Sequence, residues 1–134
     1  MACLLLLVLP PGLALAQQSR PAQPVVPAPV PEAPPPPYDP ELLKLSEAMG
    51  SMAFLRVLCT GAEEPVWRER MSALMDAEAR SSARRERLAA AYNRGYRSYA
   101  LVYRNCTESA QEALVRLARE GEALSRTLAG RFGG

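Results

Sequence analysis

The chain has 134 residues, a length that suits one small domain and is short for two. Hydrophobic residues make up 49% of it, enough to build a packed core. The 16 basic and 14 acidic side chains leave a formal net charge of +2, well below the basic excess typical of nucleic-acid-binding proteins. The sequence contains no histidine, which argues against most general-base, catalytic-triad and zinc sites and against a c-type haem.

Residues 1–16 have the features of a targeting segment. An apolar run over residues 3–15 leads into Ala14-Leu15-Ala16, the small-x-small pattern that a signal peptidase recognises. The run is shorter than the roughly 20 residues that span a bilayer, and its Pro-Pro pair would break a helix. We therefore predict a signal peptide cleaved before Gln17, in preference to a buried N-terminal helix. The mature protein is then periplasmic or secreted and does not span the membrane.

Residues 17–38 form a proline-rich segment, in which we predict neither helix nor sheet. Half of the residues from Pro21 to Pro40 are proline, which lacks an N–H donor and fixes φ. The expected conformation is a semi-extended polyproline II chain that acts as a spacer. A docking motif around Pro34–Pro37 is the alternative, and the spacer is favoured because compositional bias alone is weak support for a motif.

Residues 39–134 read as one helical domain. Its apolar residues recur at helical spacing and no segment alternates with period two, so the expected fold is all-α, a small bundle of about four helices closed by one disulfide. Short connections predict that neighbouring helices are antiparallel. The first expected helix has Asp39 as its N-cap and ends near Thr60, and the second runs from Glu64 to about Ala79. The third runs from Ser81 or Ser82 to about Asn105. The fourth begins at Thr107, with Ser109 and Glu112 at capping-box spacing.

Apolar stripes along these segments predict the core. In the first segment the stripe is interrupted by Arg56, which is expected to pair with an acid or a tyrosine hydroxyl because an unpaired buried charge is costly. The stripes of the first, second and fourth segments comprise Leu42, Leu45, Met49, Met52 and Cys59; Trp67, Met71 and Leu74; and Ala110, Leu114, Leu117, Gly121, Leu124, Leu128 and Phe132.

Cys59 and Cys106 are the two cysteines that remain after the predicted cleavage. In an oxidising compartment an even count of two indicates one disulfide. The two residues end the first and third helices, which lie at the same pole of an up-down-up arrangement. A redox-active pair is the alternative, but the Cys-x-x-Cys spacing that poises such thiols is missing.

Four tyrosines on the third segment share one helical face. Tyr92, Tyr96, Tyr99 and Tyr103 are spaced four, three and four residues apart, with Gly95 among them and arginines on the opposite side. This face, together with Arg56, is a candidate binding surface for a peptide, glycan or lipid headgroup. The competing and favoured interpretation is that the tyrosines belong to the core, as aromatic residues at helical spacing usually do. Gly95 predicts the close approach of another helix backbone or a ligand.

Three blocks of this domain carry a resemblance to a known family. They are YDPELLKLSEAMGSMAFLRVLC, WRERMSALMDAEA and RRERLAAAYNRGYRSYALVYRNCT, which contain both cysteines, the Trp-Arg pair and the Asn-Arg-Gly-Tyr motif. The region resembles a family of small exported alphaproteobacterial proteins of unknown function. The resemblance implies export and a helical domain, and it implies no catalytic residues.

The sequence therefore favours a non-enzymatic, envelope-associated interaction module with no cofactor and no metal site. Its expected partner is an envelope protein or a cell-wall component, and nucleic acid is not expected. The alternative is a small binding protein that uses the tyrosine face. Acidic pairs such as Glu63-Glu64 fit a helix start better than an acid–base site, and the serines have no histidine partner.

Overall fold

A computed structural model describes residues 33–61 and 64–133 of the chain. Four helices make up almost all of this part: α1 (Asp39–Thr60), α2 (Glu64–Glu78), α3 (Ser82–Val102) and α4 (Glu108–Phe132). The all-α prediction is confirmed, and no strand occurs in the ranges described. The predicted signal peptide and most of the proline-rich segment lie outside the described residues. None of the four helices is apolar over a length that would cross a bilayer.

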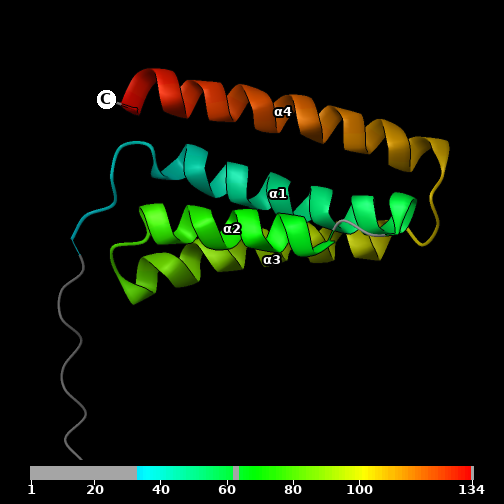
Figure 1. Cartoon of the computed structure of the whole chain (residues 1–134), viewed down its shortest axis with the longest axis horizontal. Coiled ribbons are helices and arrows are strands. Elements are labelled where there is room, and N and C mark those ends of the chain that lie inside the picture. Colours follow the sequence, from blue (N-terminus) through cyan, green and yellow to red (C-terminus); the bar gives the residue numbers. More distant parts are fainter. Residues whose placement is uncertain (1–32, 62–63, 134) are drawn as a thin grey trace, which may run out of the picture. The chain divides into compact units, whose positions relative to one another are not determined.

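The helices run alternately up and down, with α1 in the middle (Figure 1). Helix α1 packs against each of the other three, α2 also packs against α3, and within the described ranges α4 packs on α1 alone. The core is correspondingly centred on α1. Its fully or nearly buried apolar residues are Leu42, Ala48, Met49, Met52, Ala53, Leu55, Met71, Leu88, Ala91, Ala110, Ala113 and Leu117.

The backbones of α1 and α3 approach closely at two glycines. A β-carbon on Gly50 would collide with the backbone of Tyr92. One on Gly95 would collide with the carbonyl oxygen of Glu47 and lie 2.8 Å from the Ser51 hydroxyl oxygen. The prediction that another helix backbone lies close to Gly95 is therefore confirmed. Small residues such as Gly50 and Ser51 form the part of α1 that meets α3 most closely, and they are buried in addition to the predicted Leu-Met stripe.

A buried ion pair ties the start of α1 to the start of α3. The Arg84 guanidinium donates to the Asp39 carboxylate at 2.5 Å and, through Nε, to the carbonyl oxygen of Glu78 at 2.8 Å. The Arg84 and Asp39 side chains are only 7% and 10% exposed. A buried charge is tolerated in a small core when it is paired and hydrogen-bonded in this way.

Three predicted details of the helix ends were wrong, although α4 follows Thr107 as predicted. Asp39 was expected to cap α1, but its carboxylate binds Arg84, and Tyr38 precedes the helix without a side-chain capping bond. Helix α3 ends at Val102 and not near Asn105, because the backbone becomes extended at Tyr103. The cap of α4 is the Thr107 hydroxyl, which accepts from the Ala110 N–H, so the proposed Ser109–Glu112 capping box is absent. Ser81 or Ser82 was expected at the start of α3, and Ser81 is its N-cap.

A disulfide joins Cys59 to Cys106, as predicted, with the two Cα atoms 4.9 Å apart. Cys59 lies in the last turn of α1, and Cys106 lies in the connection between α3 and α4. The bond therefore fixes the pole at which α1 and α3 end and α4 begins. Helix α1 ends at Thr60, and Gly61, which follows with a left-handed φ of 82°, donates its N–H to the carbonyl oxygen of Val57.

Gly95→Ala is expected to destabilise the domain. The methyl group would press on backbone atoms that move little, and overpacking of this kind costs about 1–3 kcal/mol or more. The variant should show a lower urea midpoint with an unchanged slope. Gly130→Ala in α4 is the control, because no atom lies within 4 Å of the added carbon. The control should gain up to about 1 kcal/mol from helix propensity alone. A raised midpoint for Gly95→Ala would contradict the close packing of α1 and α3.

The disulfide should be complete and strongly stabilising in the protein that lacks residues 1–16. Titration of the denatured, unreduced protein is expected to find no free thiol. Replacing both Cys59 and Cys106 by serine opens a closed loop with a sequence separation of 47. The chain-entropy estimate for a loop of this size is a loss of about 4 kcal/mol. Two free thiols, or a double variant as stable as the parent, would contradict the assignment.

Candidate functional site

A groove runs between α2 and α4, and the nearly buried side chains of Leu42, Met49 and Met52 of α1 lie at its bottom. The groove consists of three successive hollows of about 370, 310 and 310 Å³. The first two hollows share Met52, Trp67, Arg70 and Ala118, and the second and third share Leu45 and Ser125. We call this continuous feature the α2/α4 groove. Its full lining comprises Tyr38, Leu42, Leu45, Met49, Met52, Arg56, Trp67, Arg70, Leu74, Glu78, Leu114, Val115, Ala118, Gly121, Glu122, Ser125, Leu128, Ala129, Phe132 and Gly133.

The groove exists because α2 and α4 each pack on α1 and, in the described ranges, do not pack on each other. Helix α4 presents the small residues Ala118 and Gly121 to the groove, where larger side chains would have filled it. Helix α1 supplies an unbranched, flexible floor through Met49 and Met52. Methionine adapts its shape readily, a property typical of surfaces that accept varied apolar partners.

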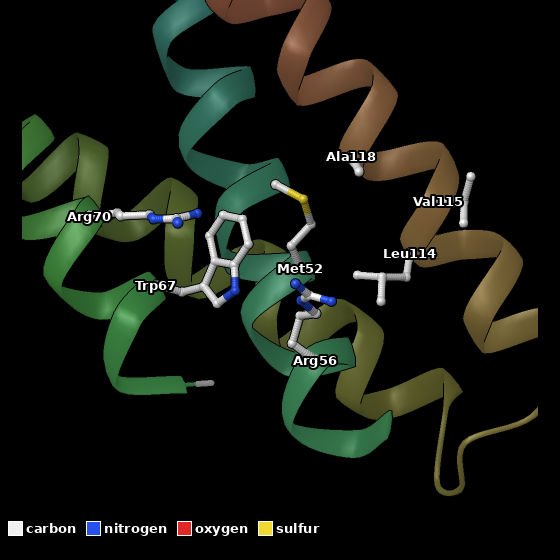
Figure 2. A pocket seen from close by; sticks show the side chains of 7 residues that line it. All are labelled: Met52, Arg56, Trp67, Arg70, Leu114, Val115 and Ala118. Atoms are coloured by element: carbon white, nitrogen blue, oxygen red, sulfur yellow. The ribbon is translucent and has the colours of Figure 1, made fainter. Parts of the chain in front are cut away.

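Trp67 forms the wall of the first hollow on the α2 side, as Figure 2 shows. The Arg70 guanidinium carbon lies 4.8 Å from the centre of the Trp67 ring, a cation–π contact. The indole N–H is buried and finds no hydrogen-bond acceptor among the described residues. In Figure 2 the nitrogen edge of the indole is turned toward the side on which Arg56 lies. An indole N–H is only a donor, so its partner must be an acceptor.

The first hollow is electropositive at one end of an otherwise apolar groove. Arg56 and Arg70 both line it, and among the residues that the structure describes no acidic side chain does. Guanidinium groups remain protonated at any ordinary pH and suit carboxylate or phosphate partners. The carboxylate lining the second hollow, Glu122, lies 3.2 Å from Arg126 on its own helix. The geometry therefore suits an apolar group that carries an acceptor or negative charge near Trp67.

The opposite end of the groove is closed by a hydrogen-bonded tyrosine. The Tyr38 hydroxyl donates to the Glu78 carboxylate at 3.0 Å, and the Tyr38 ring lies 5.3 Å from that of Phe132. The hydrogen bond to a carboxylate, followed by burial, raises the pKa of Tyr38 above its ordinary value of 10.0. The phenol therefore carries no negative charge at physiological pH, and the Arg84 guanidinium lies 5.8 Å from the centre of its ring.

The predicted tyrosine face lies on another side of the domain and is partly covered. Tyr92, Tyr96, Tyr99 and Tyr103 are all half-buried, and none of them lines the α2/α4 groove. The ring of Tyr96 meets Phe54 of α1 edge-on at 5.5 Å, and Tyr99 stacks on Tyr103 at 5.8 Å. Arg56, predicted as part of the same site, lies instead in the groove. The structure thus separates the arginine from the tyrosines.

Sequence reasoning placed Trp67 in an apolar stripe and passed over Arg70 and Ala118. Two features of the sequence could have indicated the groove. Arg70 follows Trp67, the only tryptophan of the chain, by one helical turn, and the fourth helix contains the small residues Ala118 and Gly121. In the part of the chain that the structure describes, no three histidine, cysteine or acidic residues are grouped as metal ligands would be.

Comparison with known proteins confirms one part of the resemblance, that the domain belongs to a family of unknown function. Residues 37–132 match the family model described as Protein of unknown function (DUF2385). No curated protein matches the chain, and no solved structure does. Because the match covers all four helices and both cysteines of the disulfide, the chain belongs to this uncharacterised domain family.

Proposed function

We propose that the protein is a non-enzymatic interaction module that is exported to the periplasm or secreted, and that it binds its partner in the α2/α4 groove. The observation that carries the proposal is the buried, acceptor-less indole N–H of Trp67 in an apolar hollow that Arg56 and Arg70 also line. Buried polar groups in proteins are nearly always hydrogen-bonded, so a buried donor without an acceptor among the described residues suits a partner that supplies one when it binds.

Export is supported by the sequence and by the cysteines. The apolar run and the Ala-x-Ala motif of residues 1–16 have the form of a signal peptide. A structural disulfide such as Cys59–Cys106 persists in oxidising compartments. In this proposal residues 17–38 act as a spacer between the helical domain and the envelope. The partner is then an envelope protein or a cell-wall component.

A binding role is favoured over catalysis by the chemistry of the groove. In the described part of the chain, the first hollow is lined by apolar side chains and two arginines, without a carboxylate, hydroxyl or thiol. The chain has no histidine to act as a base near neutral pH. The tyrosine face is a weaker candidate for binding, because its four side chains are half-buried and Gly95 among them lies against α1.

Export predicts a defined location and a defined N-terminus. A C-terminally tagged chain, expressed in its native host, should be recovered from the periplasmic or secreted fraction. Intact-mass measurement should then show that the mature protein begins at Gln17. A cytoplasmic protein, or an envelope-located chain that retains residues 1–16, would contradict this part of the proposal.

Binding in the groove predicts that one substitution on its wall abolishes partner capture. Ala118 is exposed and lines the first two hollows, so Ala118→Phe should fill them without disturbing the core. Ala123→Phe is the matched control, because Ala123 is exposed on the same helix and does not line the groove. Cross-linking in the native envelope should give the same adducts for the parent and Ala123→Phe and lose them for Ala118→Phe. Equal adducts for all three proteins would place the interaction elsewhere.

A further inference from the structure

We infer that the end of α3 is a second interaction surface, and that it binds the surface of an anionic membrane. The surface consists of Arg97, Leu101, Val102 and Arg104, and we call it the α3 tip. It shares no residue with the α2/α4 groove, so the inference goes beyond the proposed function and is tested separately from it.

Two adjacent aliphatic side chains are displayed to solvent at the α3 tip. Leu101 and Val102 are 75% and 70% exposed, more than any other large hydrophobic side chain in the described ranges. They are the last two residues of α3, and Figure 1 shows this end of the helix at the pole from which the chain crosses to α4. Val66, which is 42% exposed, lies in the first turn of α2, and α2 begins at the same pole. Exposed apolar side chains that gather at one end of a domain indicate contact with a protein or a membrane.

Positive charge accompanies these aliphatic side chains. Between Glu86 and Glu108 the chain contains four arginines and no acidic residue. Of these, Arg97 and Arg104 are exposed and make no ion pair or hydrogen bond with any residue that the structure describes. Arg97 precedes Leu101 by one helical turn on the same side of α3, and Arg104 follows shortly after the helix ends. The charge at the α3 tip is therefore available to an external anion.

The α3 tip is held in place by its surroundings. The rings of Tyr99 and Tyr103 stack at 5.8 Å, and the Tyr103 N–H donates to the carbonyl oxygen of Tyr99. The disulfide from Cys59 fixes the connection at Cys106, soon after Arg104. Because the tip is ordered before it meets a partner, binding does not carry the cost of ordering a loop.

The two properties together favour an anionic lipid surface over other occupants. Aliphatic side chains beside cationic ones are typical of protein segments that lie in a membrane interface, where the apolar groups leave water and the cations meet lipid phosphates. A soluble polyanion would pair with the arginines but leave Leu101 and Val102 in water. A second copy of the domain is disfavoured, because a symmetric contact through the α3 tip would bring Arg97 and Arg104 of both copies together.

The experiment uses the oxidised protein without residues 1–16 and vesicles of phosphatidylethanolamine and phosphatidylglycerol in equal parts. The protein should float with these vesicles and remain unbound with vesicles of phosphatidylcholine alone. Leu101→Ser should lower the partition coefficient about tenfold, because the aliphatic side chain that leaves water on binding is removed. Val115→Ser is the matched control, since Val115 is a 51% exposed residue of α4, and it should leave the partition coefficient unchanged.

Removing the charge tests the second property of the tip. Arg97→Gln with Arg104→Gln should weaken vesicle binding about fivefold for each arginine, the factor that corresponds to roughly 1 kcal/mol for a basic residue near an anionic surface. Arg85→Gln with Arg126→Gln is the control, because it removes the same net charge from ion-paired side chains elsewhere in the domain. An equal loss for both pairs would show attraction by net charge alone and would overturn the inference.

Insertion is measured with a tryptophan placed at the tip. Lipids brominated on their acyl chains should quench the fluorescence of Leu101→Trp strongly, and that of the parent, whose only tryptophan is Trp67, much less. Vesicle binding without this additional quenching would mean that Leu101 stays in water, and the inference fails.

Two further outcomes separate the inference from the proposed function. Ala118→Phe, which fills the groove, should bind vesicles as the parent does, and Leu101→Ser should keep the partner adducts that depend on the groove. If vesicles do not bind and Leu101→Ser loses envelope cross-links that Ala118→Phe retains, the α3 tip contacts a protein, and the lipid inference is wrong. Loss of adducts in Ala118→Phe alone, without vesicle binding by the parent, would leave the groove proposal intact and refute this one.

Discussion

The close approach of the α1 and α3 backbones is the constraint on which the rest of the structure depends. Gly50 and Gly95 allow it, because a side chain at either position would strike the backbone of the opposite helix. With the two helices in contact, Asp39 can reach Arg84 at one end of the pair, and Cys59 can reach Cys106 at the other. Helix α1 is then packed by α3, α2 and α4, and its nearly buried Met49 and Met52 lie at the bottom of the groove between α2 and α4.

The sequence predicted the features that depend on local pattern. Helical periodicity, turn residues and caps located four helices, and the even number of cysteines outside the predicted signal peptide identified the disulfide. Gly95 was informative because a glycine inside a helix normally reduces stability and so indicates a packing reason. The boundary errors have local causes. Asp39 has the chemistry of an N-cap, but Arg84, which is distant in the sequence, binds its carboxylate instead.

The features that depend on long-range packing were not predictable in the same way. Arg84 lies among several arginines of similar surroundings, and only the tertiary fold buries this one against Asp39. The second buried face of α1 is made of small residues such as Ser46 and Gly50, which produce no apolar stripe. The groove is missed for a related reason. It is defined by side chains that are absent from α4, at Ala118 and Gly121, and by the separation of two helices.

The packing of α4 on α1 alone has a thermodynamic consequence for any molecule that fills the groove. An occupant that contacts both walls adds a second interface to α4, and it can do so only while α4 is docked. Binding and folding are therefore linked: free occupant at a hundred times its Kd adds about 2.7 kcal/mol to the free energy of unfolding. This gain depends on α4 being docked. In the empty domain α4 has the fewest helix neighbours, whereas in the occupied domain it should be the last helix to undock.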